Sequence, residues 1–270
     1  KDIADTKIGI NANVDFFALS FVREAADINQ LKKFLFDNNS AAQVVAKVED
    51  QSGIKNLKEI LDVSDALMVA RGDLGIEVPY EELPIIQKQA VSDALISGKP
   101  VIMATHLLES MIESPMPTRA EITDVSNSVF ERVDCVMLSG ETSVGKYPVE
   151  CVDVLNKVTQ NVERYAGGSG FNESLPLSTT REKLMKSAVV LARELGGVGI
   201  VVFSSTGLHL RTLAALRPFG CPIFVFTEKE KIIKDSKILW GVKAFLVEFK
   251  DSQESTISDS IYHLQSAGYA

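Results

Sequence analysis

The chain has 270 residues, of which 46% are hydrophobic and 24% are charged, and its net charge is −8. This composition is typical of globular proteins with one large domain or two smaller ones, and the acidic balance disfavours nucleic-acid binding. No apolar segment reaches the roughly 18–20 residues of a membrane span, and residues 1–6 lack the apolar core of a signal peptide. Three widely spaced cysteines fit neither a metal motif nor a disulfide framework, so we expect a cytoplasmic protein.

Short apolar runs alternate with helical segments over residues 1–166. The runs rich in β-branched residues occupy 16–21, 44–48, 66–69, 101–104 and 135–138. Repeated strand–helix–strand units predict a parallel sheet, and strands without polar alternation are typical of sheets covered on both faces. Because each unit is roughly 20–35 residues long, the pattern favours part of a (β/α) barrel.

The composition changes near residue 165. Residues 167–180 are rich in Gly, Ser, Thr and Pro and are predicted to be a linker. Residues 181–270 then form a second, smaller α/β domain with an open sheet. Its predicted strands are 200–203, 223–226 and 244–247, and its predicted helices are 181–195, 208–216 and 256–265.

Charged residues follow two neighbouring strands of the predicted barrel. Lys47 and Glu49 are two residues apart and project from the same side of a strand. They form either an internal ion pair or part of a ligand site, because such charges need partners. Gly72 and Asp73 follow the next strand in a predicted tight turn, which either reverses the chain or presents amides and a carboxylate to a ligand. Together, Glu49, Asp73 and Lys47 could hold a divalent cation and a phosphoryl group.

Three further strand ends carry candidate residues. Thr105 either contacts a substrate or caps the following helix, and its neighbour His106 is either a general base or a structural residue. Residues 139–142 add small and polar side chains at the last barrel strand. In the smaller domain, a turn opens a helix and either caps it or binds phosphate. This turn consists of Ser204, Ser205, Thr206 and Gly207.

Several segments resemble the pyruvate kinase family. They cover residues 45–49, 68–75, 98–105, 117–121, 137–142 and 145–148, and they follow the order of the family's motifs. The resemblance is dense over residues 1–165 and looser beyond. It implies that the first domain is the later part of a (β/α)8 barrel, containing the last five strands.

The resemblance also implies an activity, which is phosphoryl transfer from phosphoenolpyruvate to ADP, giving pyruvate and ATP. Lys47 matches the lysine that stabilises the transferring phosphoryl group, and Glu49 and Asp73 match the Mg²⁺ ligands. Gly72 and Thr105 match substrate contacts. The K⁺ ligands of the family are expected outside this chain. Residues 204–207 match a turn where some members bind a phosphorylated sugar effector, and a homo-oligomer is expected.

The sequence also departs from the family pattern. His106 stands where Gln is common, and the small domain lacks the usual last strand or strands, so the chain resembles a C-terminal piece. We therefore expect no activity from this chain alone. Two alternatives stay open: a non-catalytic fragment that binds an effector or oligomerises, and a Mg²⁺-dependent barrel lyase acting on pyruvate or an enolate.

Overall fold

The computed structural model describes residues 2–166 and 175–269. It divides the chain into two compact units, Lys1–Pro176 (unit 1) and Leu177–Ala270 (unit 2). Residues 167–174 of the predicted linker lie outside the described residues. Among the described helices, none is both long enough and apolar enough to cross a membrane.

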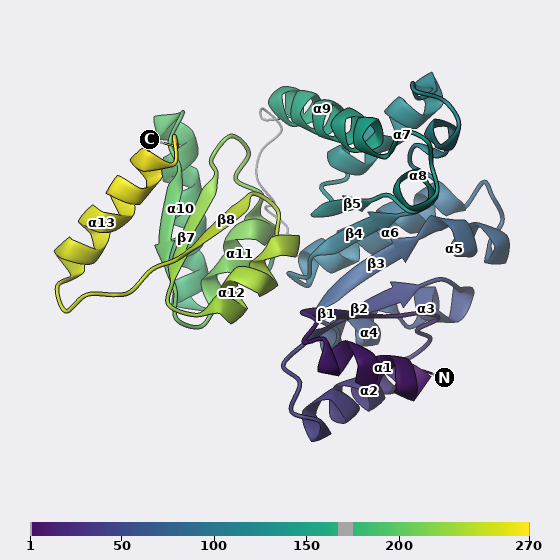
Figure 1. Cartoon of the computed structure of the whole chain (residues 1–270), viewed down its shortest axis with the longest axis horizontal. Helices are drawn as coiled ribbons and strands as arrows, with labels where there is room; N and C mark the ends of the chain where they lie inside the picture. Colours follow the sequence, from purple (N-terminus) through teal and green to yellow (C-terminus); the bar gives the residue numbers. More distant parts are fainter. Residues whose placement is uncertain (1, 167–174, 270) are drawn as a thin grey trace. The chain divides into compact units, whose positions relative to one another are not determined.

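Unit 1 contains a sheet of five parallel strands, arranged in the order of the sequence (Figure 1). Each strand lies within two residues of its predicted position, which confirms the partial barrel. The strands are β1 (Phe16–Leu19), β2 (Gln43–Val48), β3 (Ala66–Ala70), β4 (Val101–Ala104) and β5 (Cys135–Met137). The two outer strands, β1 and β5, each pair on one side only within the described sheet.

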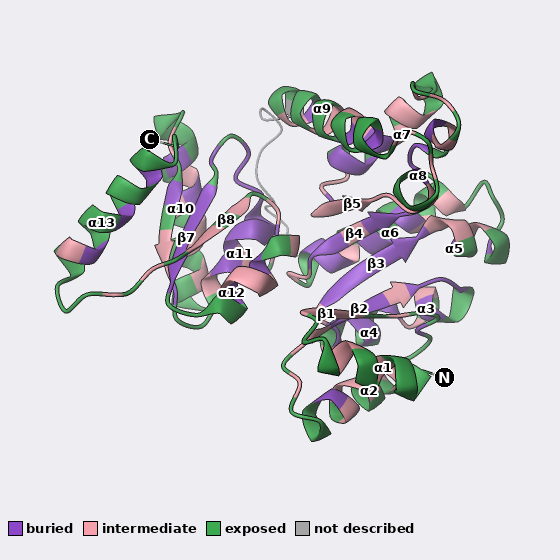
Figure 2. Ribbon diagram, in the orientation of Figure 1, coloured by how far each residue is buried: buried purple, intermediate pink, exposed green. Residues whose placement is uncertain are grey.

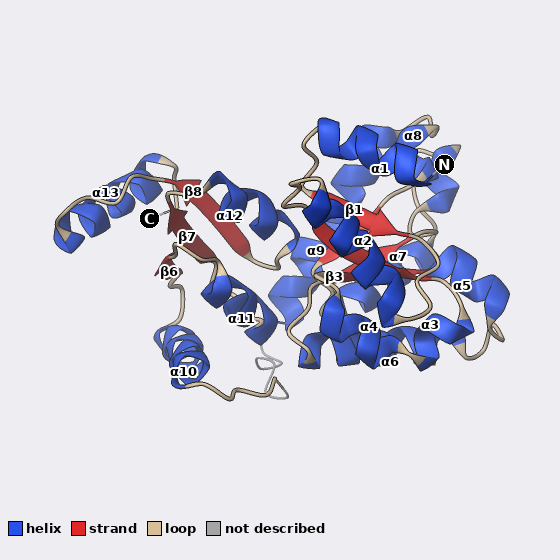
Figure 3. Ribbon diagram, turned by 90° about the horizontal axis from the view of Figure 1, so that it is seen from below, coloured by secondary structure: helices blue, strands red, loops and turns tan. Residues whose placement is uncertain are grey.

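Helices connect these strands, and Figure 3 shows them in blue around the red sheet of unit 1. They are α1 (Asp2–Asn11), α2 (Ala25–Asp37), α3 (Gln51–Lys55), α4 (Leu57–Val63), α5 (Arg71–Glu77), α6 (Leu83–Ile96), the 3₁₀ helix η1 (Glu109–Ile112), α7 (Arg119–Phe130), α8 (Gly140–Ser143) and α9 (Pro148–Ala166). The predicted tight turn after β3 is therefore wrong, because Gly72 and Asp73 lie in the first turn of α5.

The core of unit 1 lies along its central strands. All five residues of β3 are buried (Figure 2). Leu67 and Val69 of this strand pack in one cluster with Leu74 of α5 and Met103 of β4. Since both faces of β3 are covered, the strand has no polar alternation, as the sequence predicts. The buried strands hold their carboxyl ends in fixed register.

Unit 2 contains a sheet of three parallel strands in sequence order, β6 (Ile200–Phe203), β7 (Ile223–Thr227) and β8 (Val242–Leu246). Its helices are α10 (Thr180–Leu195), α11 (Leu208–Leu216), α12 (Glu230–Asp235), the 3₁₀ helix η2 (Ser236–Ile238) and α13 (Gln253–Ser266). The predicted open-sheet α/β unit is confirmed.

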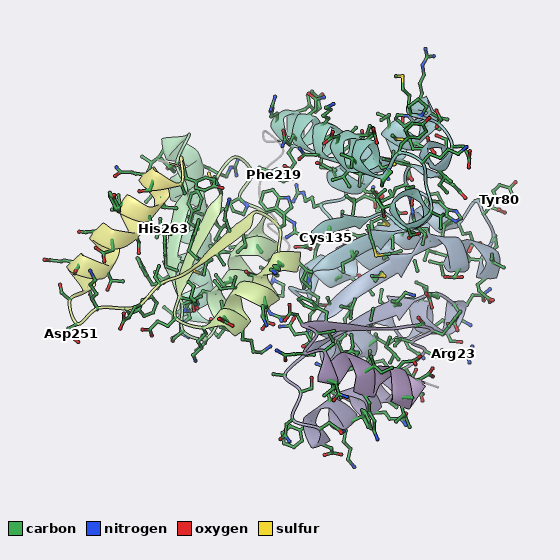
Figure 4. All side chains as sticks on the ribbon, in the orientation of Figure 1. Arg23, Tyr80, Cys135, Phe219, Asp251 and His263 are labelled. Carbon is green, nitrogen blue, oxygen red and sulfur yellow. The ribbon has the colours of Figure 1, made fainter. Side chains whose placement is uncertain are left out.

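Aromatic rings fill the space between the second sheet and α13. Phe226 and Phe245 stack with ring centroids 5.3 Å apart, and His263, labelled in Figure 4, meets Phe245 edge-on at 5.0 Å. Such offset and edge-on contacts add stability beyond apolar burial. This packing anchors the last described helix to the sheet of unit 2.

Candidate functional site

The carboxyl ends of β2, β3 and β4 bring the predicted residues to one edge of the sheet. Val48 pairs with Val69, and Ala70 pairs with Ala104. Because the strands are parallel, the residues that follow them emerge at the same edge. Glu49 follows β2, α5 begins directly after β3, and Thr105 follows β4.

Lys47 and Glu49 form the ion pair that their spacing suggests. The Lys47 Nζ lies 2.8 Å from the Glu49 Oε1, and the Glu49 side chain is only 1% exposed. The other carboxylate oxygen accepts a hydrogen bond from the Phe21 amide at 2.7 Å. Lys47 also donates to the Ser20 hydroxyl at 3.1 Å. The buried carboxylate is therefore compensated on both oxygens.

Gly72 and Thr105, predicted separately as substrate contacts, bind each other. The Gly72 amide donates to the Thr105 hydroxyl oxygen at 2.8 Å, and this hydroxyl donates to the Ala104 carbonyl at 2.6 Å. The hydroxyl thus links α5 to the end of β4. A ligand oxygen that reached the Gly72 amide would replace Thr105 as its acceptor.

The backbone after β4 has an uncommon conformation. Thr105 and His106 have φ values of 71° and 54°. Side chains other than glycine rarely adopt this left-handed region, and a residue held there costs about 1–3 kcal/mol. The interpretation of Thr105 as a helix cap is wrong, because the next helical segment, η1, has Leu108 as its cap. Strained residues of this kind concentrate at functional sites.

Arg71 is a site residue that the sequence reasoning missed. It is the first residue of α5, its side chain is 10% exposed, and its Nη1 lies 2.6 Å from the Asp124 Oδ1. Its Nη2 donates to the carbonyls of Thr105 at 2.8 Å and His106 at 3.3 Å. A charge directly after a buried strand is the signal that could have found it, since such a charge needs partners.

Asp73 is exposed in the first turn of α5. Within residues 2–166 and 175–269, no group of three or more His, Cys, Asp or Glu side chains could hold a metal ion. The two predicted ligands, Glu49 and Asp73, are both carboxylates, and Mg²⁺ usually binds one or two carboxylates together with water and substrate phosphates. The chemistry of this donor pair therefore suits Mg²⁺.

The imidazole of His106 lies beside Gly72 at the strand ends, where its Nε2 would be 3.4 Å from a Cβ atom built on Gly72. Its side chain is 64% exposed, and its Nδ1 lies 3.8 Å from the Glu109 Oε2. The general-base role and the structural role of His106 both stay predictions.

Another buried carboxylate, which the sequence analysis did not single out, lies beyond β5. Glu141 is 2% exposed and accepts hydrogen bonds from the amides of Leu108 at 3.1 Å and Ser139 at 2.8 Å. Burial, together with the nearby carboxylates of Glu141 and Glu150, raises the pKa of the Cys151 thiol. Glu141 joins the segment after β4 to the segment after β5, which gives it a structural role.

In unit 2, the turn formed by residues 204–207 connects β6 to α11. Ser204 is buried, and its hydroxyl accepts a hydrogen bond from the Gly207 amide at 2.9 Å. Gly207 itself is the capping residue, with a φ of 76° that favours glycine. The prediction that a Ser or Thr side chain caps α11 is therefore wrong, and Ser205 and Thr206 are exposed.

Comparison with known proteins decides the family. The sequence family described as "Pyruvate kinase, barrel domain" matches residues 1–152, and "Pyruvate kinase, alpha/beta domain" matches residues 182–270. The chain belongs to the pyruvate kinase family. Its relatives include a pyruvate kinase of Dictyostelium discoideum, which is 42% identical, with 92% of this chain and 50% of the relative aligned.

Other pyruvate kinases share this pattern. Isozyme A of Ricinus communis, described as chloroplastic, is 38% identical over 99% of this chain and 48% of its own length. The crystal structure of a pyruvate kinase from Cryptosporidium parvum superposes with a TM-score of 0.93 at 34% identity, covering 100% of this chain and 58% of that one. The chain therefore spans about half the length of the curated pyruvate kinases it matches.

Proposed function

We propose that this chain supplies the phosphoryl-transfer part of a pyruvate kinase site. In the proposed reaction, a bond forms between an ADP β-phosphate oxygen and the phosphorus of phosphoenolpyruvate, and the bond from phosphorus to the enol oxygen breaks. The enolate then takes up a proton to give pyruvate. The observation that carries the proposal is the Lys47–Glu49 pair at the carboxyl end of β2, in a chain of this family.

Lys47 is proposed to stabilise the phosphoryl group during transfer. Phosphoryl transfer places charge on three equatorial oxygens, and positioned cations neutralise it. The Lys47 ammonium is held by Glu49 and Ser20, so its position is set before a ligand binds. Preorganised charge of this kind costs little rearrangement during the reaction.

Glu49 and Asp73 are proposed to bind Mg²⁺. When bound, the ion would neutralise phosphoryl oxygens and orient them. Glu49 would share its carboxylate between the ion and its present partners, Lys47 and the Phe21 amide. Gly72 and Thr105 are proposed to bind the carboxylate or enolate end of the substrate, because they offer an amide and a hydroxyl at the same edge of the sheet.

A metal-binding experiment tests this site without requiring turnover. Mn²⁺ can replace Mg²⁺ as a probe, and its paramagnetic resonance signal falls when it binds. We expect the chain to bind Mn²⁺, and we expect Asp73→Asn to weaken binding by about tenfold or more, since a charged ligand is lost. Glu77→Gln is a matched control, because Glu77 is an exposed carboxylate of the same helix.

Two results would contradict the proposed metal site. One is a chain that fails to reduce the Mn²⁺ signal at millimolar concentration. The other is equal binding by the Asp73→Asn and Glu77→Gln variants, which would indicate diffuse attraction to an acidic protein.

We also propose that residues 204–207 bind a phosphorylated effector. The exposed hydroxyls of Ser205 and Thr206 precede α11, and helix starts attract anions. Calorimetry with sugar phosphates and inorganic phosphate tests the proposal. We expect binding that Thr206→Ala weakens, whereas an absence of heat with every ligand would leave the turn with a structural role only.

The remaining expectations concern the whole assembly. We propose K⁺ dependence, with ligands supplied by other chain segments, and a homo-oligomer in the cytoplasm. The family match favours phosphoryl transfer over the lyase alternative. The open edges of β1 and β5 favour a chain that needs a partner for turnover, in line with the non-catalytic alternative for the chain alone.

A further inference from the structure

We propose that Arg71 is a positioning residue that holds the Thr105 hydroxyl against the Gly72 amide. This inference rests on the proposed function, in which Gly72 and Thr105 contact the substrate. Arg71 contacts neither the Gly72 amide nor the Thr105 hydroxyl. It acts through the backbone carbonyls of the turn after β4. Three observations support the assignment: its contacts, the backbone conformation of the turn, and the position of Gly72 in α5.

The contacts of Arg71 join three segments of unit 1. The guanidinium extends from the start of α5, forms an ion pair with Asp124 of α7, and donates to the carbonyls of Thr105 and His106. Hydrogen bonds from a charged donor are stronger than neutral ones. The planar guanidinium can serve a carboxylate and two carbonyls at once, which the single ammonium of a lysine does less well.

The turn needs an external restraint because its backbone is strained. Thr105 is β-branched and has a φ of 71°, and His106 has a φ of 54°. Such residues persist only where surrounding contacts determine their conformation. Both carbonyls that accept from Arg71 belong to these two residues. Arg71 therefore binds the part of the turn that would otherwise relax.

The position of Gly72 makes the positioning role of Arg71 measurable. Gly72 is the second residue of α5, and the first amides of a helix have no acceptor within the helix. Its amide donates to the Thr105 hydroxyl instead. Any movement of Thr105 would expose the Gly72 amide to water, while the rest of α5 could stay folded. Hydrogen exchange at this single amide thus reports on the arrangement that Arg71 maintains.

The experiment is a double-mutant cycle on the complete chain, with Gly72 amide exchange measured by nuclear magnetic resonance. We expect Arg71→Lys and Thr105→Ala each to accelerate exchange by about tenfold or more, as expected for loss of a hydrogen bond. If Arg71 acts through Thr105, the double variant exchanges no faster than Thr105→Ala alone. The amides of Val48 and Val69, which are paired residues of β2 and β3, should keep their protection from exchange.

Arg23→Lys provides the matched control. Arg23, labelled in Figure 4, pairs with Asp50 at 2.7 Å, is 65% exposed, and makes no described contact with the turn after β4. Unchanged Gly72 exchange in Arg71→Lys would overturn the proposal. So would an acceleration that is equally large in the Thr105→Ala background, or one that Arg23→Lys reproduces. If Arg71→Lys unfolds, Asp124→Asn removes the anchor of the guanidinium and takes its place in the cycle.

A ligand measurement separates this inference from the proposed function. Oxalate is a planar dianion close in size to the enolate of pyruvate, and its binding to the Mn²⁺-loaded chain can be followed by calorimetry. We expect Arg71→Lys to change the affinity for oxalate, because an oxalate oxygen and the Thr105 hydroxyl would compete for the Gly72 amide, whereas Arg23→Lys leaves the affinity unchanged. Failure of the unsubstituted chain to bind oxalate would contradict the proposed function, and the exchange cycle would still decide the role of Arg71.

Discussion

Glu121 shows how one carboxylate can link two loops of unit 1. It completes a capping box with Thr118 at the start of α7, and it accepts hydrogen bonds from the amide and hydroxyl of Ser110. Burial pushes the pKa of the Glu121 carboxyl upward, but the donors on Ser110 and Thr118 outweigh it and hold the pKa below its usual 4.5. Ionised Glu121 therefore stabilises the folded state.

The lowered pKa of Glu121 determines how the free energy of unfolding changes with pH. Stability from Glu121 is fully present above pH 4.5 and is lost as the pH falls through the lower folded-state pKa. We expect Glu121→Gln to cost about 1 kcal/mol at neutral pH, a typical value for a lost cap. The difference from the unsubstituted chain should shrink as the pH falls below 4.5 and through the lower folded-state pKa. Urea unfolding at several pH values measures this difference in the free energy of unfolding. Glu81→Gln is the control, because Glu81 is exposed.

Lys47 leads to a kinetic prediction for an active assembly that contains this chain. Lys47→Met keeps most of the side-chain length but removes the charge. Because the charge is needed most when phosphoryl oxygens develop charge, kcat should fall much more than KM rises. Lys55→Met, at the exposed end of α3, should leave both constants unchanged. A raised KM with unchanged kcat would make Lys47 a binding residue only.

The contacts of some single residues could be predicted from the sequence, and those of others could not. The two-residue spacing of Lys47 and Glu49 on a strand was enough to predict a shared side, and the ion pair follows from it. The contact between Gly72 and Thr105 could not be predicted, because it depends on a left-handed turn formed by residues that usually avoid it. Asp124, far along the chain from Arg71, gave no local signal either.

At the scale of elements, the strands were predictable and some helices were not. β-branched runs that are buried on both faces stand out in a sequence, so β4 was predicted without error. The segment after β3 contains two glycines, which favour turns, yet burial of Leu74 in the core keeps it helical. Short α12 lacks the length for a clear periodicity.

The edge strand β1 leads to a prediction about association. An exposed strand edge presents unpaired amides and carbonyls, which favour pairing with another chain, and a lysine on such a strand opposes it. Ala18 is the exposed residue of β1. We expect the chain to sediment as an oligomer, and Ala18→Lys to shift it toward the monomer. Ala12→Lys, in the exposed turn after α1, is the control and should not.

At the scale of the molecule, the described sheet of unit 1 runs from β1 to β5, and no pairing of β5 with β1 closes it. A closed (β/α)8 barrel surrounds its catalytic edge with loops from all strands, and phosphoryl transfer depends mainly on such positioning. We therefore expect no measurable turnover from this chain alone. A coupled assay with phosphoenolpyruvate, ADP, Mg²⁺ and K⁺ measures it. Turnover near the ~1–100 s⁻¹ usual for kinases would contradict this expectation.

One of the three cysteines lies on an edge strand of the unit 1 sheet, and this position affects its reactivity. Burial raises the pKa of the thiols of Cys151 and Cys221, so few of these groups are thiolates at neutral pH. Cys135 is half-buried and lies on the edge strand β5. A maleimide dye would therefore attach to Cys135 first. Its emission would then change whenever another strand covers β5, so one native side chain can serve as an optical reporter of strand docking.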